Sequence, residues 1–251
     1  MTIEDGRPKY WLIAMALREA IDSGEYPPGA RLPGENDVIR DHAVARATAR
    51  QALAQLVNWG LAEARKGSGI YVREFRPIVR DGIVRLGGAT WPSGTSVWSA
   101  ETEGRDLVVD QLEVSQAEPP GQVGLLLGLP EGDEAVLRSR RYVLDGKPVL
   151  LSRSWLSARV AAGTPIAQPN PGPGGVYARL AELGRSPARF REDLRSRMPQ
   201  PEEAERLAIA PGTPVVEISR VALAADGTPV EVSEMIADSS AYIFRYEFDG
   251  R

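Results

Sequence analysis

The sequence predicts an α+β protein of two parts. The smaller, N-terminal part combines helices with a β-hairpin, and the larger, C-terminal part is built on an antiparallel sheet. Two observations predict this division. Up to residue 73, apolar residues recur at helical spacing in three short segments. Beyond residue 82, proline and glycine separate short strand-like runs, and two of these stretches resemble each other at an offset of 80 to 81 residues.

Three helices are predicted in the N-terminal part. The first covers residues 9–23, the second residues 34–42 and the third residues 46–58. Gly24 and Gly60 follow the first and third helices, where glycine commonly ends a helix. One face of the third helix is apolar, and we expect it to be buried. This face consists of Ala49, Ala52, Leu53 and Leu56.

Residues 61–72, LAEARKGSGIYV, predict a small β-hairpin directly after the third helix. Apolar and polar residues alternate on both sides of a turn that lies at Gly67–Gly69. Three short helices followed by a hairpin make a winged helix-turn-helix, in which the hairpin is the wing.

The segment REFRPIVRDG, residues 73–82, is charged and is interrupted by Pro77, which is typical of a linker. We therefore expect a winged helix-turn-helix domain at residues 1–75, a linker at 76–85 and a second domain at 86–251. Helical patterns within the second domain lie at about residues 121–128, 175–183 and 201–208.

The second domain contains an internal repeat, because residues 132–156 resemble residues 212–236. Each copy reads as a strand, an Asp-Gly turn and a returning strand, since Asp-Gly suits the tight turn of a hairpin. The two turns are Asp145-Gly146 and Asp226-Gly227. Two similar hairpins predict an antiparallel sheet with pseudo-twofold character, and a groove between the two halves is a natural place for a ligand.

Composition excludes several classes of chemistry. The chain has no cysteine and a single histidine, His42, so it cannot form disulfides, thiolate metal sites, histidine metal clusters or a Ser-His-Asp triad. We expect no metal and no cofactor. The first residues are acidic and polar, unlike a signal peptide. No apolar run approaches the roughly 18 residues of a membrane span, so we expect a cytoplasmic protein without a membrane partner.

The positive charge of the chain is concentrated around the predicted third helix and wing. The formal net charge of the whole chain is −4, but residues 38–73 contain six basic residues and two acidic ones. A local excess of basic residues of this kind suits contact with the phosphates of DNA.

Side chains on the third helix and the wing are suited to reading DNA. Arg46 and Arg50 lie one turn apart, opposite the apolar face, where arginine can reach the guanine acceptors of the major groove. Lys66 adds charge to the wing, and Gly67 permits a close approach of its backbone to phosphate. For the two arginines alone, an ordinary amphipathic helix with a solvated charged face is the alternative.

Residues 24–72 resemble the DNA-binding domain of the gluconate-repressor (GntR) superfamily, whose pattern is PG-x-x-LPSE, VSR-x-TVR-x-AL-x-x-L-x-x-x-GL and G-x-G-x-x-V. The chain departs from this pattern at three positions. Gly34 and Ala45 replace serines that would cap helices, for a loss of about 1 kcal/mol or less each, and Ala49 replaces a valine. The resemblance implies that DNA is contacted by Arg31, Arg46, Thr48, Arg50 and Gly67.

The rest of the chain, about residues 80–248, resembles the effector domain of the histidine-utilisation-repressor (HutC) branch, which is called UTRA. The similar segments are RSRRYVLDGKPVLLSRSWL, GGVYARLAELG, PEEAERLAIAPGTPV and DGTPVEVSE. This resemblance implies a chorismate-lyase-like fold, in which helices flank a central antiparallel sheet. It also implies a homodimer and an effector pocket whose occupation relieves repression.

The family's pocket positions fall on Arg138, Arg140, Tyr177, Glu231 and Ser233. Arg138 and Arg140 are two apart on a predicted strand and so share one face, where paired guanidiniums suit a phosphate or a carboxylate. Glu231 and Ser233 share a face in the same way. A solvent face with surface charges is the alternative. Leu150, Leu151 and Ser152 stand where the family often has an acidic residue, which argues against assuming a sugar-phosphate effector.

Together these patterns predict a ligand-responsive transcriptional regulator and not an enzyme. We expect a repressor that binds an inverted-repeat operator in double-stranded DNA as a homodimer and is released by a small, polar, anionic effector. One alternative is an enzyme of lyase-like fold that carries a DNA-binding head. The other is a constitutive DNA-binding protein with a degenerate effector pocket.

Overall fold

The computed structural model describes residues 7–74, 77–82, 86, 102 and 104–248. The chain divides into two compact units. The first comprises residues 1–76 with 209–213, and the second comprises residues 77–208 with 214–251.

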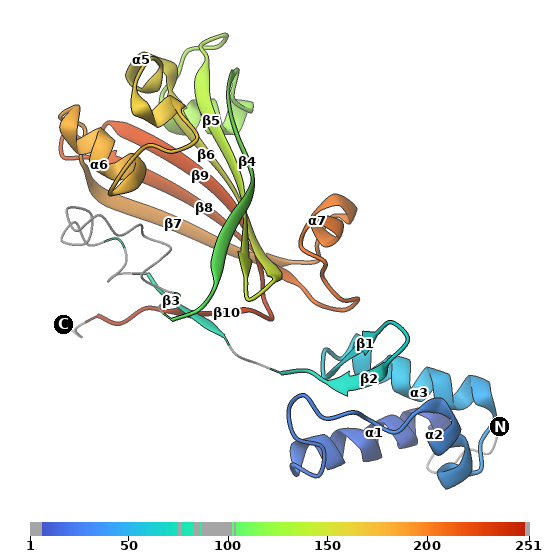
Figure 1. Ribbon diagram of the computed structural model, residues 1–251. Coiled ribbons are helices and arrows are strands. Elements are labelled where there is room, and N and C mark those ends of the chain that lie inside the picture. The colour runs from blue at the N-terminus through green and yellow to red at the C-terminus, as the bar shows by residue number, and fades with distance from the viewer. Residues whose placement is uncertain (1–6, 75–76, 83–85, 87–101, 103, 249–251) are drawn as a thin grey trace. The chain divides into compact units, whose positions relative to one another are not determined.

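The N-terminal unit is the predicted winged helix-turn-helix. Its helices are α1 (Lys9–Asp22), α2 (Glu35–His42) and α3 (Arg46–Asn58), and its strands are β1 (Ala62–Arg65) and β2 (Gly69–Val72). β1 and β2 pair antiparallel and form the wing (Figure 1).

The apolar face of α3 lies in the core of this unit, as the spacing of its residues predicted. Ala49, Ala52, Leu53 and Leu56 are all buried against apolar residues of α1 and α2. No side chain caps α3 at Ala45. At the start of α2, Asp37 Oδ2 accepts a hydrogen bond of 3.1 Å from the Gly34 amide, so one polar group of that helix end is satisfied despite the missing serine.

The second unit is built on an antiparallel sheet with the strand order β4-β5-β6-β9-β8-β7 among the described residues (Figure 1). These strands are β4 (Leu107–Ala117), β5 (Ala135–Leu144), β6 (Lys147–Ser157), β7 (Pro187–Arg197), β8 (Val215–Ala224) and β9 (Pro229–Asp238). This arrangement confirms the predicted antiparallel-sheet domain. The two repeats form the hairpins β5–β6 and β8–β9, which meet where β6 pairs with β9.

Both Asp-Gly pairs lie in the turns of these hairpins, but the two turns differ. Asp145 and Gly146 both have positive φ angles, of 50° and 77°, as the tightest hairpin turns require. In the second turn only Gly227 has a positive φ, of 84°. There the side chain of Asp226 accepts a hydrogen bond of 2.9 Å from the Thr228 amide.

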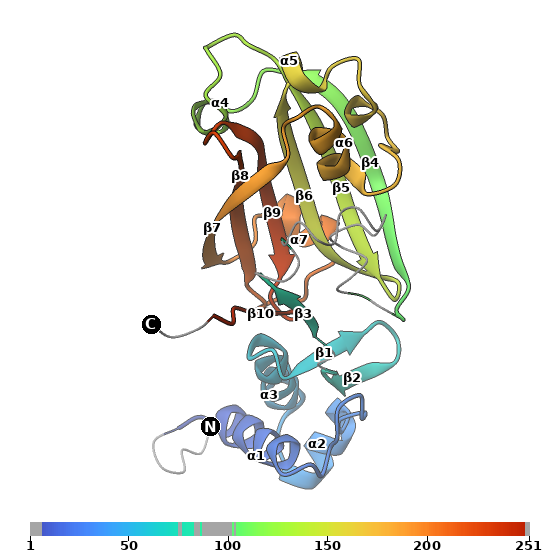
Figure 2. The same ribbon diagram turned by 90° about the vertical axis from the view of Figure 1, so that its left-hand side faces the viewer.

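Helices flank the sheet on both faces, and the three helical patterns of this domain are confirmed. α5 (Ala158–Ala161), a 3-10 turn (Pro165–Ala167) and α6 (Gly175–Glu182) lie over one face. α4 (Gly121–Leu127) packs on the other face, and α7 (Pro201–Arg206) lies on that side too (Figure 2).

The structure differs from the expected linker at residues 78–81. This segment is strand β3 (Ile78–Asp81), which pairs in parallel with β10 (Tyr242–Arg245). Pro77 and the neighbouring charges suggested an exposed connection, but Ile78 and Arg80 are 3% and 1% exposed. Arg80 is buried because a carboxylate more than a hundred residues away neutralises it. Residues 76 and 83–85 of the expected linker lie outside the described residues.

Two glycine-to-alanine changes test whether a positive φ angle alone makes an added methyl group destabilising where no neighbouring atom would clash with it. A Cβ at Gly146 or Gly121 would meet nothing within 4 Å, but only Gly146 has a positive φ. We expect Gly146→Ala to lower the free energy of unfolding by about 1–2 kcal/mol. Gly121→Ala, the matched control, should raise it by about 0.4–1 kcal/mol because it restricts the unfolded chain. Urea denaturation measures both changes, and destabilisation of the same size at both positions would contradict the interpretation.

Candidate DNA-binding surface and ligand pocket

The first turns of α3 present the side chains predicted to contact DNA. Arg46 is the first residue of the helix, and it and Arg50 are exposed, while Thr48 is half-buried. Arg46 Nη2 donates to Asn36 Oδ1 at 3.4 Å, which links the start of α3 to α2. The first turn of α3 contains no acidic residue. No carboxylate of this turn therefore repels an anion that approaches the guanidiniums and the positive end of the helix.

The tip of the wing is formed by Lys66 and Gly67, which are both exposed. Gly67 has a φ of +72° and nothing within 4 Å of a Cβ, so the turn is left-handed and open. The neighbouring Arg65 is held by Glu63 at 2.9 Å and lies 4.3 Å above the ring of Tyr71. The tip is thus the part of the wing whose backbone is free to approach a ligand.

Arg31 lies beside the wing, although it precedes α2 in the sequence. Its backbone forms a bridge with Tyr71 of β2. Its guanidinium crosses Gly69, where a Cβ would be 3.1 Å from Arg31 Nε. The structure therefore places Arg31 beside Gly69 and Tyr71 of the wing. Arg46, Thr48 and Arg50 share the start of α3.

A cavity of about 320 Å³ lies between the sheet and the segment that leads into α6. Four of the five predicted pocket residues line it, namely Arg138, Arg140, Tyr177 and Glu231. The other lining residues include the apolar Leu107, Val109 and Leu112 of β4, Val176, the segment Pro169–Gly172 and the charged Arg220. Ser233 is fully buried beneath the cavity.

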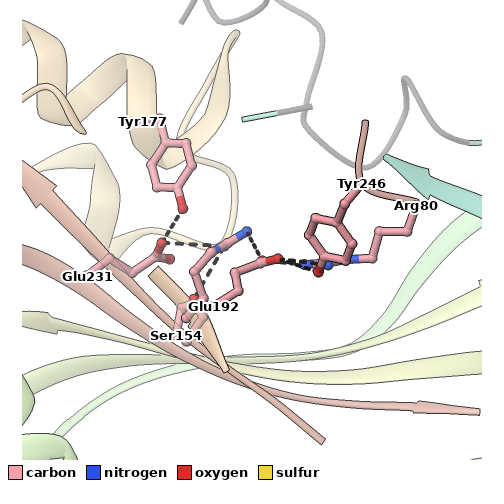
Figure 3. Close-up of polar contacts among 8 residues, drawn as sticks. Arg80, Ser154, Tyr177, Glu192, Glu231 and Tyr246 are labelled. Atoms are coloured by element: carbon pink, nitrogen blue, oxygen red, sulfur yellow. Dashed lines mark hydrogen bonds and ion pairs between the residues drawn. The ribbon is translucent and has the colours of Figure 1, made fainter. Parts of the chain in front are cut away.

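Glu231 is a buried carboxylate at the floor of the cavity, and Tyr177 of α6 points toward it (Figure 3). Tyr177 Oη donates a hydrogen bond of 2.5 Å to Glu231 Oε2, and Arg220 Nη2 lies 3.5 Å from the same oxygen. Burial raises the pKa of Glu231, but Arg220 and the Tyr177 hydrogen bond lower it by more, so the net shift of this pKa is downward. Glu231 is therefore ionised at neutral pH.

Arg138 is fixed by backbone rather than held free for a ligand. Its Nη1 donates to the carbonyl oxygens of Ile166 and Gln168 at 2.6 and 2.5 Å, and its Nη2 donates to that of Pro169 at 2.9 Å. Burial and then Arg140 lower the pKa of Arg138 to about 10, which still leaves it protonated at neutral pH. Arg138 thus anchors the segment that forms one wall of the cavity.

Arg140 and the buried serines form the middle of the site. Arg140 Nη2 donates to Ser154 Oγ at 2.7 Å, and Ser154 Oγ lies 3.0 Å from Ser233 Oγ. Arg140 Nε has no hydrogen-bond partner among the described residues, although it is buried. Arg138 Nε is also buried without a partner, but both Nη groups of Arg138 donate to backbone carbonyls, whereas Arg140 donates only through Nη2 among the described residues. Arg140 therefore has more donor capacity left for a ligand.

Arg220 also lines the cavity, and the sequence interpretation missed it. It is 5% exposed, and burial lowers its pKa while Tyr177, Glu231 and Glu192 raise it by more, so the net shift of this pKa is upward. The repeat held the signal, because Arg140 and Arg220 occupy matching positions 80 residues apart. The strand register agrees, since Arg140 is opposite Ser152 and Arg220 is opposite Ser233.

The described residues contain no group of three or more histidine, aspartate or glutamate side chains that could hold a metal ion. No helix in the same residues combines the length and the apolar character that a membrane crossing requires.

Comparison with known proteins shows the family to which the chain belongs. Residues 9–72 match the model of the bacterial regulatory proteins of the gntR family, and residues 102–243 match the UTRA domain. The uncharacterized HTH-type transcriptional regulator SCO4628 of Streptomyces coelicolor is 31% identical over 249 residues, which cover 96% of this chain and 93% of that protein. The HTH-type transcriptional repressor NagR of Bacillus subtilis is 26% identical over 243 residues, which cover 96% and 95%.

Solved structures share the fold along the chain. A crystal structure described as that of a GntR-family transcriptional regulator has a TM-score of 0.65 at 28% identity, covering 98% of this chain and 99% of that one. PhnF from Mycobacterium smegmatis has a TM-score of 0.59 at 21% identity, covering 95% and 100%, a likeness that shows the fold alone. The chain therefore belongs to the GntR family of bacterial transcriptional regulators and combines that family's DNA-binding domain with a UTRA effector domain; it is a regulator and not an enzyme.

Proposed function

We propose that the protein is a repressor that binds an inverted-repeat operator as a homodimer and is released when a small anionic ligand enters the cavity of the UTRA domain. The observation that carries this proposal is the pairing of two features in one chain. An exposed arginine surface lies at the start of α3, and a cavity with buried charges lies in the second unit. One relative, NagR, is a transcriptional repressor, which supports repression rather than activation.

The DNA-binding half of the proposal rests on the first turns of α3 and on the wing. A helix that carries Arg46 and Arg50 suits the major groove, where arginine pairs with the O6 and N7 acceptors of guanine. A wing tip with Lys66 and an open Gly67 turn suits a phosphate contact, which adds affinity without sequence preference.

The homodimer follows from the inverted-repeat operator, because a twofold DNA site is matched by a twofold protein. The sheet offers a surface that supports association. Among the described strands, β4 pairs only with β5 and so lies at an edge of the sheet. Val108 of this strand is 47% exposed and does not line the cavity, which is unusual for an apolar side chain on an unpaired edge.

The cavity suits an anion that also has an apolar portion. Arg140 and Arg220 supply positive charge, and Glu231 and Tyr177 can orient a polar group. Leu107, Val109 and Leu112 supply an apolar wall that offers no hydrogen bonds to the hydroxyls of a sugar. The effector that fits this description is a small organic carboxylate or phosphate with a hydrocarbon part.

The full chain tests the proposal directly. Selection from random double-stranded DNA should yield an inverted repeat, and sedimentation should give two chains per repeat. A thermal-shift screen of small organic anions should then find a ligand that raises the midpoint of unfolding and releases the operator. Selected DNA without twofold symmetry would contradict the dimeric repressor, and the absence of any stabilising anion would favour a constitutive DNA-binding protein.

The first prediction concerns base recognition by α3. Arg46→Ala should weaken binding to the selected operator by about 1–3 kcal/mol, because a bidentate contact to guanine is lost. Binding to scrambled DNA should change much less. Arg18→Ala, at an exposed ion pair of α1, is the matched control and should leave the operator affinity unchanged. Fluorescence anisotropy measures these affinities, and equal operator affinity for wild type and folded Arg46→Ala would remove Arg46 from the interface.

A second prediction separates backbone strain from DNA approach at the wing. Valine at position 67 would be strained by the φ of +72°, whereas asparagine tolerates this conformation. If the wing backbone approaches phosphate closely, Gly67→Val and Gly67→Asn should both weaken binding to all DNA sequences. Only Gly67→Val should lower thermal stability. Wild-type DNA affinity in Gly67→Asn would show that the wing tip does not contact DNA.

A third prediction concerns the cavity. Arg140→Ala should raise the ligand concentration needed to release the operator about tenfold or more, because a charge-assisted hydrogen bond is lost. Its affinity for the operator without ligand should stay close to that of the wild type. Arg153→Ala, at an exposed position on the neighbouring strand β6, is the control and should respond like the wild type. Equal responses of wild type and Arg140→Ala would place the ligand elsewhere.

A further inference from the structure

A continuous row of paired residues crosses the whole sheet beneath the cavity. Each member lies directly opposite the next on the neighbouring strand. From β4 to β7 the row is Val114, Arg138, Ser154, Ser233, Arg220 and Glu192. Because directly opposed residues in a sheet point to the same face, the polar groups of this row lie side by side on the face that carries the cavity. The row joins the cavity floor to the far edge of the sheet.

Arg220 lies between two carboxylates with little exposure, Glu192 of this row and Glu231 of the cavity floor. Figure 3 shows these two carboxylates. Its Nη2 is 3.5 Å from Glu231 Oε2, and its Nη1 is 4.0 Å from Glu192 Oε1. Both distances are longer than those of good charged hydrogen bonds. Among the described residues, Arg220 Nε and Nη1 have no hydrogen-bond partner although they are buried. Arg220 Nη2 also donates to Ser233 Oγ at 3.5 Å, and the guanidinium lies 5.7 Å from the centre of the Tyr177 ring. None of these contacts has the length of a strong ion pair, so the guanidinium has room to shift toward either carboxylate.

Glu192 contacts both Arg220 and Arg80 of β3. Arg80 of β3 donates two hydrogen bonds to Glu192, from Nη1 at 2.9 Å and from Nη2 at 2.5 Å. Arg80 and Glu192 are 1% and 7% exposed, so this ion pair fastens β3 to β7 in a region from which water is excluded. Tyr246, which follows β10, contacts the same carboxylate at 3.5 Å. Two arginines therefore compete for Glu192, one from the cavity and one from β3.

The second unit begins at Pro77, directly after the first unit in the sequence, and β3 is its first strand. We propose that Arg220 and Glu192 transmit the state of the cavity to β3 through Arg80. When Arg220 moves toward the cavity, Glu192 interacts with Arg80 alone, and the ion pair that attaches β3 to β7 is stronger. When Arg220 moves toward Glu192, the ion pair between Glu192 and Arg80 is weaker. This proposal rests on the proposed function in one respect, that the cavity is where the ligand binds.

Hydrogen exchange of the full chain tests the relay without a ligand and without DNA. The readout is the peptide that covers residues 77–82, where the amides of Ile78 and Gly82 donate to Ala241 and Arg245. Glu231→Gln should speed exchange in this peptide about fivefold or more, because Arg220 loses its partner at the cavity and turns to Glu192. Tyr177→Phe should slow it, because Glu231 then holds Arg220 more strongly. Both effects should vanish in the Glu192→Gln background, where no carboxylate is left to share.

Controls separate the relay from general loosening of the fold. Glu203→Gln breaks the ion pair of Glu203 with Arg197 near α7 and should leave exchange at residues 77–82 unchanged. Thermal unfolding of every variant checks that it is folded, and Tyr177→Phe keeps the test valid if Glu231→Gln does not fold. Effects of the cavity variants that persist unchanged in Glu192→Gln would overturn the relay. That result would leave DNA binding untouched, whereas wild-type operator affinity in Arg46→Ala would count against the proposed function and not against the relay.

Discussion

The second unit depends on how a few buried charges are neutralised. Arg80, Arg220 and Glu231 are each at most 5% exposed, and each has an opposite charge within 4.0 Å. Removing one partner from such a pair costs about 3–5 kcal/mol, because the remaining charge stays buried without compensation. Typical domains are stable by only about 5–15 kcal/mol, so each member constrains the others strongly. The positions of β3, β7, β8 and β9 are therefore linked by charge as well as by apolar packing.

The buried arginines of the cavity differ in how much of their hydrogen-bonding capacity is already used. Arg138 gives its Nη donors to backbone carbonyls and so behaves as part of the wall. Among the described residues, Arg138 and Arg140 each keep a buried Nε without a hydrogen bond, whereas Arg220 keeps both Nε and Nη1. An anion would satisfy such donors and lower the cost of their burial. The part of the cavity next to these arginine donors is thus where an anion would gain the most binding energy.

Local patterns in the sequence predicted most of the fold, because helices and hairpins are set by nearby residues. The spacing of Ala49, Ala52, Leu53 and Leu56 predicted the buried face of α3, and the repeated Asp-Gly pairs predicted both hairpins. Four of the five expected pocket residues line one cavity, although their contact with a ligand stays a prediction. What could not be predicted depends on distant contacts. Arg80 reads as a linker charge until Glu192, 112 residues away in the sequence, is placed beside it.

The parallel pairing of β3 with β10 has a consequence for synthesis of the chain. Ile78 pairs with Tyr242, so the first and last strands of the second unit are neighbours in the folded domain. During translation the N-terminal unit leaves the ribosome first and has its own core, whereas β3 must wait for most of the remaining chain before its partner strand exists. Closing so long a segment is slow because its ends must first find each other. The N-terminal unit of a nascent chain can therefore form its core well before β3 is fixed in place.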